Sequence, residues 1–272
     1  GKGSGNADRS QNKRDHVKVP GEYAKIMLPE LTFPYLIPGQ EVLLDDGKIH
    51  LKIVEKAENV TENGGENTQE KRYFAKVLWG GLLKSRKSAA LPGAKIYPPT
   101  LTNSDLANIK IAKEMGVTGV MQPFVRDHSD LECVKEALRE AGAEDIRLFA
   151  KIENMDGVRK LEKLLPAADE IVIARGDLGN AVHLWDLPGV QRQISEKCRA
   201  AGKPFMVVTQ MLASMERSPV PTRAEVNDIF HAVMDGAASI MVTGETAVGD
   251  YPVEVIRYMV NTVRSAEKEE NR

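Results

Sequence analysis

After Lys95, short apolar runs alternate with longer segments in which apolar residues recur at helical spacing. The apolar runs are expected to be strands: Val117–Met121, Leu148–Ile152, Ile171–Ala174, Phe205–Thr209 and Ser239–Thr243. The segments between them carry patterns such as Leu131, Val134 and Leu138, which place apolar side chains on one helix face. Short apolar strands separated by helices are typical of a parallel sheet covered on both faces.

The chain before residue 95 has a different pattern, which predicts antiparallel strands. Glu41–Leu44 leads into the turn Asp45-Asp46-Gly47, Ile49–Val54 alternates beyond it, and Tyr73–Trp79 is a further strand candidate. We expect an exposed hairpin loop over Lys56–Arg72 and a loose first 16 residues. The sequence therefore predicts a β-rich domain over residues 1–94 and an α/β domain over residues 95–272.

The α/β part contains five strand–helix units, and two architectures fit them. A closed (β/α)8 barrel has eight such units in about 250 residues. An open, doubly wound sheet of five parallel strands fits equally well. Periodicity alone leaves both open.

Several helix ends are marked by local signals. Ser129 with Glu132, and Thr222 with Glu225, have the spacing of a capping box. Gly116 and Gly142 stand where glycines end helices. We expect helices to begin and end at these positions.

Composition narrows the class of protein. The 272 residues include 42% hydrophobic and 28% charged residues, with a net charge of −2 and a pI near 6.3. This balance does not suggest a nucleic-acid partner or a polybasic membrane surface, and no apolar run approaches the ~20 residues of a membrane span. No signal-peptide pattern is seen at the start, and Cys133 and Cys198 are expected to be core thiols, so we expect a cytoplasmic protein.

Polar residues follow every predicted strand: Arg126; Lys151 and Glu153; Arg175 and Asp177; Thr209 and Gln210; Thr243 and Glu245. In α/β folds the carboxyl edge of the sheet is where ligands bind. Taken singly, each has an ordinary structural explanation, such as a surface salt bridge or a helix cap. Agreement among five strands favours a functional edge.

The residue types at this edge indicate a class of chemistry. Glu153 and Asp177 offer hard oxygen ligands suited to Mg²⁺ or Mn²⁺. Lys151 offers a compact positive charge of the kind that stabilises a transferring phosphoryl group. The sequence has no Walker loop, Rossmann glycine fingerprint or zinc ligand set.

Longer motifs around these residues resemble the pyruvate kinase family. They are Lys151-Ile152-Glu153-Asn154-x-x-Gly157, Ala174–Gly179, Gly202-Lys203-Pro204, Thr209–Leu212 with Ser214-Met215, Pro221–Glu225 and Gly244–Ala247. Their order and spacing match that family. In the first part, Val42–Gly47 resembles the turn of the family's small lid domain, and the stretch from Gly80 to Ala94 resembles the lid's return to the barrel.

The resemblance implies a fold and a reaction. The fold would be a partial TIM barrel of the pyruvate kinase type with a small all-β lid domain. The reaction would move the phosphoryl group of phosphoenolpyruvate to ADP, giving pyruvate and ATP in glycolysis, with Mg²⁺ or Mn²⁺ and K⁺ as cofactors. Lid closure would exclude water from the reacting phosphoryl group.

The resemblance also implies residue roles. Lys151, Thr209 and Thr243 would be catalytic, and Glu153 and Asp177 would bind the metal. Substrate would be bound by Ala174, Arg175, Gly176, Asp177 and Thr209. Arg86 and Lys87 match paired basic residues that reach the nucleotide.

The chain departs from the family pattern in several places. Three barrel strands that precede the lid, with an Arg that contacts the phosphoryl group and the K⁺ site, cannot be assigned here, nor can the C-terminal domain. Thr243 replaces a Ser, Val248 replaces a Lys, and Asn180 begins a stretch that has lost an acidic residue.

These departures leave several interpretations open. The chain could be a piece of a whole enzyme. It could be a divergent member that closes its sheet differently or by pairing with another chain, as in a homo-oligomer. It could also be a ligand-binding relative without turnover. A Mg²⁺-dependent lyase or aldolase acting on pyruvate enolates is a further alternative, although such enzymes lack the lid.

Overall fold

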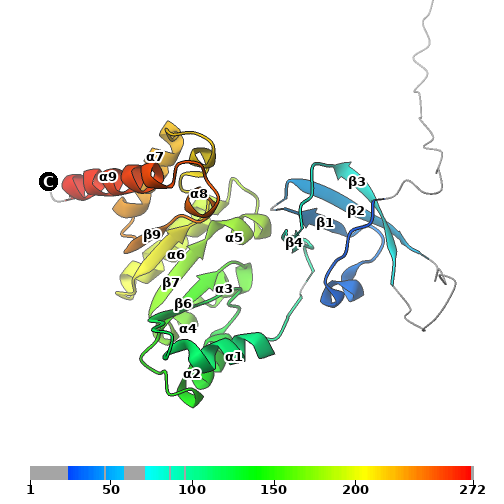
Figure 1. The fold of residues 1–272 in the computed structure, drawn as a ribbon, viewed down its shortest axis with the longest axis horizontal. Coiled ribbons are helices and arrows are strands. Elements are labelled where there is room, and N and C mark those ends of the chain that lie inside the picture. Colours follow the sequence, from blue (N-terminus) through cyan, green and yellow to red (C-terminus); the bar gives the residue numbers. More distant parts are fainter. Residues whose placement is uncertain (1–23, 46, 58–70, 86, 95, 271–272) are drawn as a thin grey trace, which may run out of the picture.

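Figure 1 shows the computed structural model, which describes residues 24–45, 47–57, 71–85, 87–94 and 96–270. The first 16 residues and residues 58–70 of the expected hairpin loop lie outside these ranges. No helix within the described ranges is long and apolar enough to cross a bilayer.

The first part is built on a four-stranded antiparallel sheet. Its elements are the 3-10 helix η1 (Glu30–Tyr35) and strands β1 (Glu41–Leu44), β2 (Ile49–Lys56), β3 (Tyr73–Trp79) and β4 (Ala89–Ala90), with strand order β3-β2-β1-β4. The β1–β2 hairpin turns at Asp45 and Gly47, both with positive φ, 49° and 83°. Glycine adopts that conformation without a steric penalty, which accounts for the predicted turn. A small core that includes Val42, Leu51 and Leu91 lies on one side of this sheet.

The second part alternates strands and helices. Its first half contains α1 (Asn103–Ala112), β5 (Gly119–Gln122), α2 (His128–Glu140), β6 (Arg147–Ile152), α3 (Met155–Arg159), α4 (Leu161–Leu164), η2 (Leu165–Ala167) and β7 (Glu170–Ala174). Its second half contains α5 (Arg175–Ala181), α6 (Leu187–Ala200), β8 (Phe205–Val208), η3 (Ala213–Glu216), α7 (Arg223–Met234), β9 (Ser239–Met241), α8 (Gly244–Ala247) and α9 (Pro252–Glu270). The five strands coincide with the five predicted apolar runs to within two residues at each end.

The strand order decides between the two architectures that periodicity left open. The five parallel strands follow one another in chain order, β5-β6-β7-β8-β9. A doubly wound sheet reverses its order at a switch point, whereas a barrel adds each strand on the same side of the last. The sheet is therefore part of a singly wound, barrel-type fold, in which no closed barrel is formed by the described strands.

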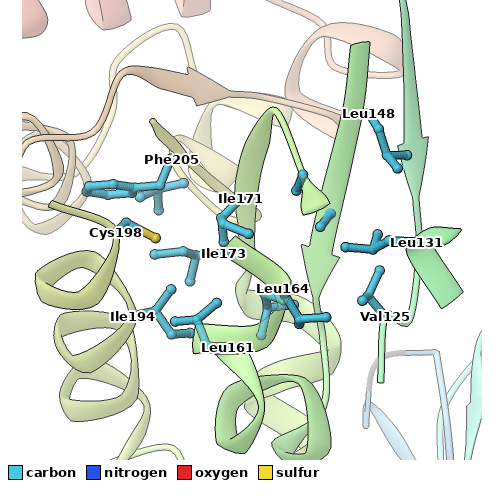
Figure 2. Packing of buried hydrophobic residues seen from close by; sticks show 14 of the residues in the cluster. Val125, Leu131, Leu148, Leu161, Leu164, Ile171, Ile173, Ile194, Cys198 and Phe205 are labelled. Atoms are coloured by element: carbon cyan, nitrogen blue, oxygen red, sulfur yellow. The ribbon is translucent and has the colours of Figure 1, made fainter. Parts of the chain in front are cut away.

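The two faces of this sheet have different surroundings. Alternate strand residues such as Leu148, Ile171 and Phe205 point into the main core, where they meet helix residues such as Leu131 and Ile194 (Figure 2). The residues between them face the other side, where a smaller cluster forms: Val172, Ala174 and Val208, with Met121, Phe149, Met206 and Met241 packed against them. Because side chains alternate along a strand, Lys151 shares the face of Phe149, on the inner side of the curved sheet.

Two predicted helix starts have different outcomes. The capping box of Thr222 and Glu225 is confirmed at the start of α7. The capping box of Ser129 and Glu132 is wrong, because α2 begins two residues earlier than that box would place it. Asp127 is its N-cap and accepts a hydrogen bond from the Ser129 amide. Gly116 and Gly142 have the left-handed backbone expected of helix-ending glycines, with φ of 72° and 64°.

The prediction for the cysteines is half right. Cys198 is buried in the main core, but Cys133 is exposed. On α2, Cys133 lies about 200° around the helix from the buried Leu131, on the face opposite the core. Both are free thiols.

The antiparallel and parallel sheets form separate bodies in Figure 1, joined by the segment between β4 and α1. The β1–β2 turn comes close to α5, because a Cβ on Gly47 would lie 3.7 Å from Oδ1 of Asn180. The exact domain boundary at residues 94 and 95 stays a prediction.

Candidate active site at the carboxyl edge of the parallel sheet

The end of β6 carries an ion pair. The Lys151 ammonium lies 2.8 Å from Oε1 of Glu153. The Glu153 side chain is 3% exposed and that of Lys151 is 24% exposed, so the carboxylate is buried and the ammonium reaches the surface. A nearly buried carboxylate of this kind needs partners for both oxygens.

The second oxygen of Glu153 is bound by backbone. The Phe124 amide donates to Oε2 at 2.7 Å. Phe124 has a φ of 52°, a conformation that is rare for a bulky residue and that directs its N–H toward the carboxylate. No sequence signal marked Phe124, because its role depends on a loop conformation and not on a side chain.

The ends of β7 and β8 are joined by Arg175. Ala174 pairs with Val208 in the sheet. Arg175 and Thr209 directly follow these two residues and contact each other. The Arg175 guanidinium donates through Nη2 and Nε to the Thr209 carbonyl oxygen, at 2.7 and 3.2 Å. Its Nη1 donates to Asp228 of α7 at 2.8 Å. The side chain of Arg175 is therefore bound to two groups of the protein itself, the Thr209 carbonyl and the Asp228 carboxylate.

Gly176 lies directly against the Thr209 side chain. A Cβ on Gly176 would stand 3.2 Å from Thr209 Cγ2 and 3.6 Å from Oγ1. Thr209 has a φ of 83° and Gln210 a φ of 54°. Backbone in this region costs about 1–3 kcal/mol per non-glycine residue, so the surroundings must hold both residues in place.

Asp177 is the third residue of α5, which directly follows β7, and Glu153 directly follows β6, the strand that pairs with β7. Two carboxylates that follow neighbouring strands fit a Mg²⁺ site, because Mg²⁺ is commonly held by one or two carboxylates, with water and substrate oxygens completing the set. The described part of the chain contains no cluster of three or more His, Cys, Asp or Glu side chains suited to a metal.

The end of β9 is fixed by Glu245, a residue that is 2% exposed. Its Oε2 accepts the Thr243 amide at 2.8 Å, and its Oε1 accepts the Leu212 amide at 3.3 Å. Glu245 therefore ties the loop after β9 to the loop after β8. The sequence singled out Glu245 as a strand-end residue but gave it no role.

The predicted nucleotide residues lie in the first part of the chain. Lys87 pairs with Asp45 of the β1–β2 turn, with 2.8 Å between Nζ and Oδ1. The hydrogen bond from Lys87 lowers the pKa of Asp45 below its usual range. Arg86 falls outside the described residues, so the expected basic pair is seen only in part.

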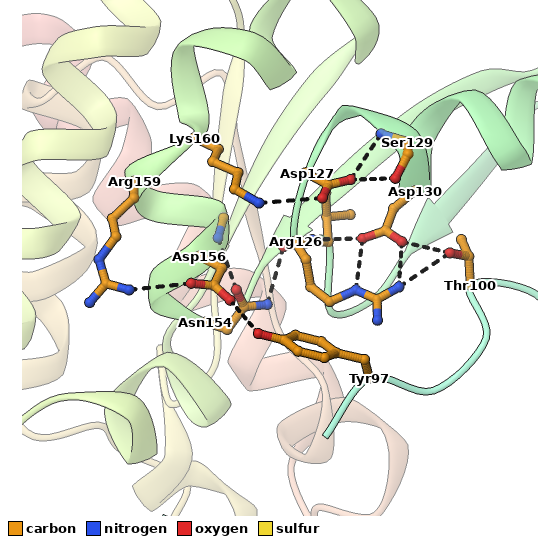
Figure 3. A network of polar contacts seen from close by, with 12 residues as sticks. Tyr97, Thr100, Arg126, Asp127, Ser129, Asp130, Asn154, Asp156, Arg159 and Lys160 are labelled. Atoms are coloured by element: carbon orange, nitrogen blue, oxygen red, sulfur yellow. Dashed lines mark hydrogen bonds and ion pairs between the residues drawn. The ribbon is translucent and has the colours of Figure 1, made fainter. Parts of the chain in front are cut away.

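Arg126, which follows β5, belongs to a different polar network (Figure 3). It donates to Asp130 from its amide, Nε and Nη2, and to the Pro98 carbonyl from Nη1 at 3.2 Å. Tyr97 lies under the guanidinium and donates to Asp156 at 3.2 Å. Arg126 thus binds the segment that leads from the antiparallel sheet to α1.

A depression of about 220 Å³ lies beside this network. It is lined by Tyr97, Arg126, Asp127, Ser129, Asp130, Asp156 and Lys160. None of the expected catalytic, metal or substrate residues lines it, so it is distinct from the strand-end site.

Comparison with known proteins gives a consistent result. The family model described as "Pyruvate kinase, barrel domain" matches residues 10–256. The pyruvate kinase of Geobacillus stearothermophilus is 40% identical over 233 residues, covering 84% of this chain and 38% of the relative. That of Bacillus licheniformis is 38% identical, covering 85% and 38%, and that of Chlamydia pneumoniae is 36% identical, covering 89% and 48%. The chain thus spans less than half the length of these curated relatives.

Proposed function

This chain belongs to the pyruvate kinase family, and we propose that it carries part of that family's active site, for transfer of a phosphoryl group from phosphoenolpyruvate to ADP. The fold agrees with membership: a partial barrel of this type with a small all-β domain. The observation that carries the proposal is the Lys151–Glu153 pair, a cation and a buried carboxylate held 2.8 Å apart at the carboxyl edge of the sheet.

Lys151 would stabilise the transferring phosphoryl group. Phosphoryl transfer spreads negative charge over the equatorial oxygens, and a preorganised cation lowers the energy of that state. The Lys151 ammonium is partly exposed and is oriented by Glu153, so it needs little reorganisation to meet an anionic oxygen.

Glu153 and Asp177 would hold Mg²⁺ or Mn²⁺. Among the described residues, each Glu153 oxygen has one partner, Lys151 or the Phe124 amide, and a carboxylate oxygen has capacity for a second. Bound there, the metal would neutralise charge on the substrate oxygens. K⁺ is proposed from the family alone.

The enolpyruvate carboxylate would be bound by backbone around Ala174, Arg175, Gly176 and Asp177. The absence of a side chain at Gly176 leaves room for a ligand beside Thr209. Thr209 and Thr243 would belong to the hydroxyl network that returns a proton to the enolate, and Glu245 would keep Thr243 in place.

On the nucleotide side, Arg86 and Lys87 would approach ADP when the small domain closes. Lys87 would then exchange its ion pair with Asp45 for a phosphate oxygen. We also propose a cytoplasmic protein that forms a homo-oligomer, which sedimentation in solution would test.

Product analysis tests this proposal. The chain is incubated with phosphoenolpyruvate, ADP, Mg²⁺ and K⁺, and ATP and pyruvate are measured by ³¹P and ¹H NMR. We expect equal amounts of both products. Pyruvate formed without ADP would contradict a kinase and favour a lyase, and metal-dependent ligand binding without product would favour a binding protein.

The metal assignment has its own test. Binding of Mn²⁺, followed by electron paramagnetic resonance with and without oxalate as a mimic of the enolate, is compared in wild type and Asp177→Asn. Asp186→Asn, at an exposed carboxylate before α6, serves as the matched control. We expect Asp177→Asn alone to lose binding; equal binding in all three proteins would remove Asp177 from the site.

A further inference from the structure

The loop after β8 leaves the sheet in a conformation that its own sequence does not favour. Thr209 and Gln210 both have positive φ, at 83° and 54°. Thr209 is β-branched, and β-branched residues are genuine outliers in this region of conformational space. The conformation must therefore be held from outside the loop.

Arg175 supplies a contact of this kind. Two of its nitrogens converge on the Thr209 carbonyl oxygen, at 2.7 and 3.2 Å, and Nη2 also lies 2.8 Å from Sδ of Met211. Its side chain is 13% exposed, so these hydrogen bonds are largely shielded from water. A guanidinium has a rigid planar fork, so fixing the fork fixes the carbonyl direction.

The opposite side of the guanidinium is also fixed. Nη1 lies 2.8 Å from Oδ1 and 2.7 Å from Oδ2 of Asp228. Asp228 belongs to α7, which begins at a complete capping box and packs against α9. Arg175 is thereby held between a regular helix and the carbonyl that it orients.

From this geometry we propose that Arg175 is a positioning residue that keeps Thr209 in its left-handed conformation, with the Thr209 side chain against Gly176. The consequence for turnover rests on the proposed function, in which Thr209 takes part in protonating the enolate. The consequence for the backbone of Thr209 does not depend on it. Lys cannot replace Arg here, because an ammonium cannot bind the carbonyl and Asp228 in the same planar geometry.

The test compares Arg175→Lys and Asp228→Asn with wild type. Arg192→Gln, which removes an exposed Arg–Glu pair on α6, is the matched control. Three quantities are measured: the turnover number, the exchange of solvent deuterium into the methyl group of pyruvate, and the affinity for Mn²⁺.

We expect Arg175→Lys to lower turnover and methyl exchange about tenfold to a hundredfold, because small displacements of reacting groups have effects of that size. Mn²⁺ affinity should stay within about twofold of wild type, since this guanidinium is bound to the Thr209 carbonyl and to Asp228. Asp228→Asn should give a smaller loss of the same kind, and it keeps the inference testable if Arg175→Lys fails to fold. Wild-type turnover and exchange in both variants would overturn the inference.

A crystal structure of Arg175→Lys separates this inference from the proposed function. If wild type shows no phosphoryl transfer, the proposed function fails. The backbone of Thr209 in the variant would still show whether Arg175 keeps Thr209 in its left-handed conformation. We expect φ at Thr209 to leave the positive region. Retention of positive φ at Thr209 would show that Arg175 does not hold it.

Discussion

Lys151 lies in β6 and Glu153 directly follows that strand, and their charged groups meet at 2.8 Å. The Lys151 ammonium lies against Oε1 of Glu153, one of the two oxygens that could bind a metal. The same ammonium is partly exposed and faces the inner side of the sheet. One contact therefore links the proposed phosphoryl-stabilising cation to the proposed metal ligand.

Replacing Lys151 by Met separates these two roles. Phosphoryl transfer should fall by about a hundredfold to a thousandfold, because a preorganised charge at the reacting group is lost. Mn²⁺ affinity should be equal to or higher than that of wild type, because the ammonium no longer competes for Oε1. Titration of Mn²⁺ alongside a turnover assay checks this; a parallel loss of both would mean that Lys151 only supports the carboxylate.

Gly176→Ala tests the packing of Gly176 on Thr209. The new Cβ would stand 3.2 Å from Thr209 Cγ2, so the Thr209 side chain must move and activity should fall about tenfold or more. Thr209→Ser removes that methyl group and keeps the hydroxyl. The double variant should therefore recover much of the loss, as measured by a double-mutant cycle of kcat/KM. Additive effects of the two substitutions would argue against this contact.

Asp130 makes stability dependent on acid pH. Burial would raise its pKa, but hydrogen bonds from Arg126 and Thr100 outweigh burial and lower the pKa from 3.8 to about 2. A carboxyl with a lowered folded-state pKa stabilises the fold above pH ~4, and that stability is lost as the pH falls toward 2.

Asp130→Asn should therefore remove about 1–2 kcal/mol at pH 7 and flatten the pH dependence between 4 and 2. Urea unfolding at a series of pH values measures this. Asp145→Asn is the matched control, because Asp145 forms an exposed pair with Lys113. An unchanged slope in Asp130→Asn would contradict the assignment.

The two cysteines should differ in reactivity. Burial raises the pKa of Cys198 to about 12, whereas Cys133 is exposed on α2. Only the thiolate reacts with alkylating reagents, so the native chain should take up one label, at Cys133. Mass spectrometry of the labelled protein, native and in denaturant, checks this; native labelling of Cys198 would show that the main core opens.

Local patterns predict the strands of this protein well, because each strand alternates between two apolar environments. Phe149 and Ala150, for example, face the inner cluster and the main core respectively. The same patterns could not choose between a barrel and an open sheet, since the order in which strands pair is a property of the whole chain.

Local sequence signals predict a helix start or a buried position wrongly where nearby residues change the outcome. Ser129 has the spacing of an N-cap, but the Asp127 carboxylate takes the Ser129 amide and the helix starts earlier. Cys133 is expected in the core as part of an apolar helix face, although the helix turns it outward.

The candidate site is predictable only in part. Motifs lead to the proposal of Lys151, Glu153 and Asp177, because their residue types carry the chemistry. The contact of Arg175 with Thr209 and Asp228 spans 34 and 53 residues and depends on how the loops leave the sheet. Phe124 contributes only its amide, so its side chain gives no signal.

The most direct measurement is the rate at which phosphoenolpyruvate and ADP yield ATP in wild type, Glu153→Gln and Glu162→Gln. Glu162 is the matched control, because it forms an ion pair with Lys197 on the helical side of the domain. We expect equal amounts of ATP and pyruvate from wild type and Glu162→Gln, and a loss of about a hundredfold or more in Glu153→Gln. ATP formation by Glu153→Gln at the wild-type rate would contradict an active site built on this carboxylate.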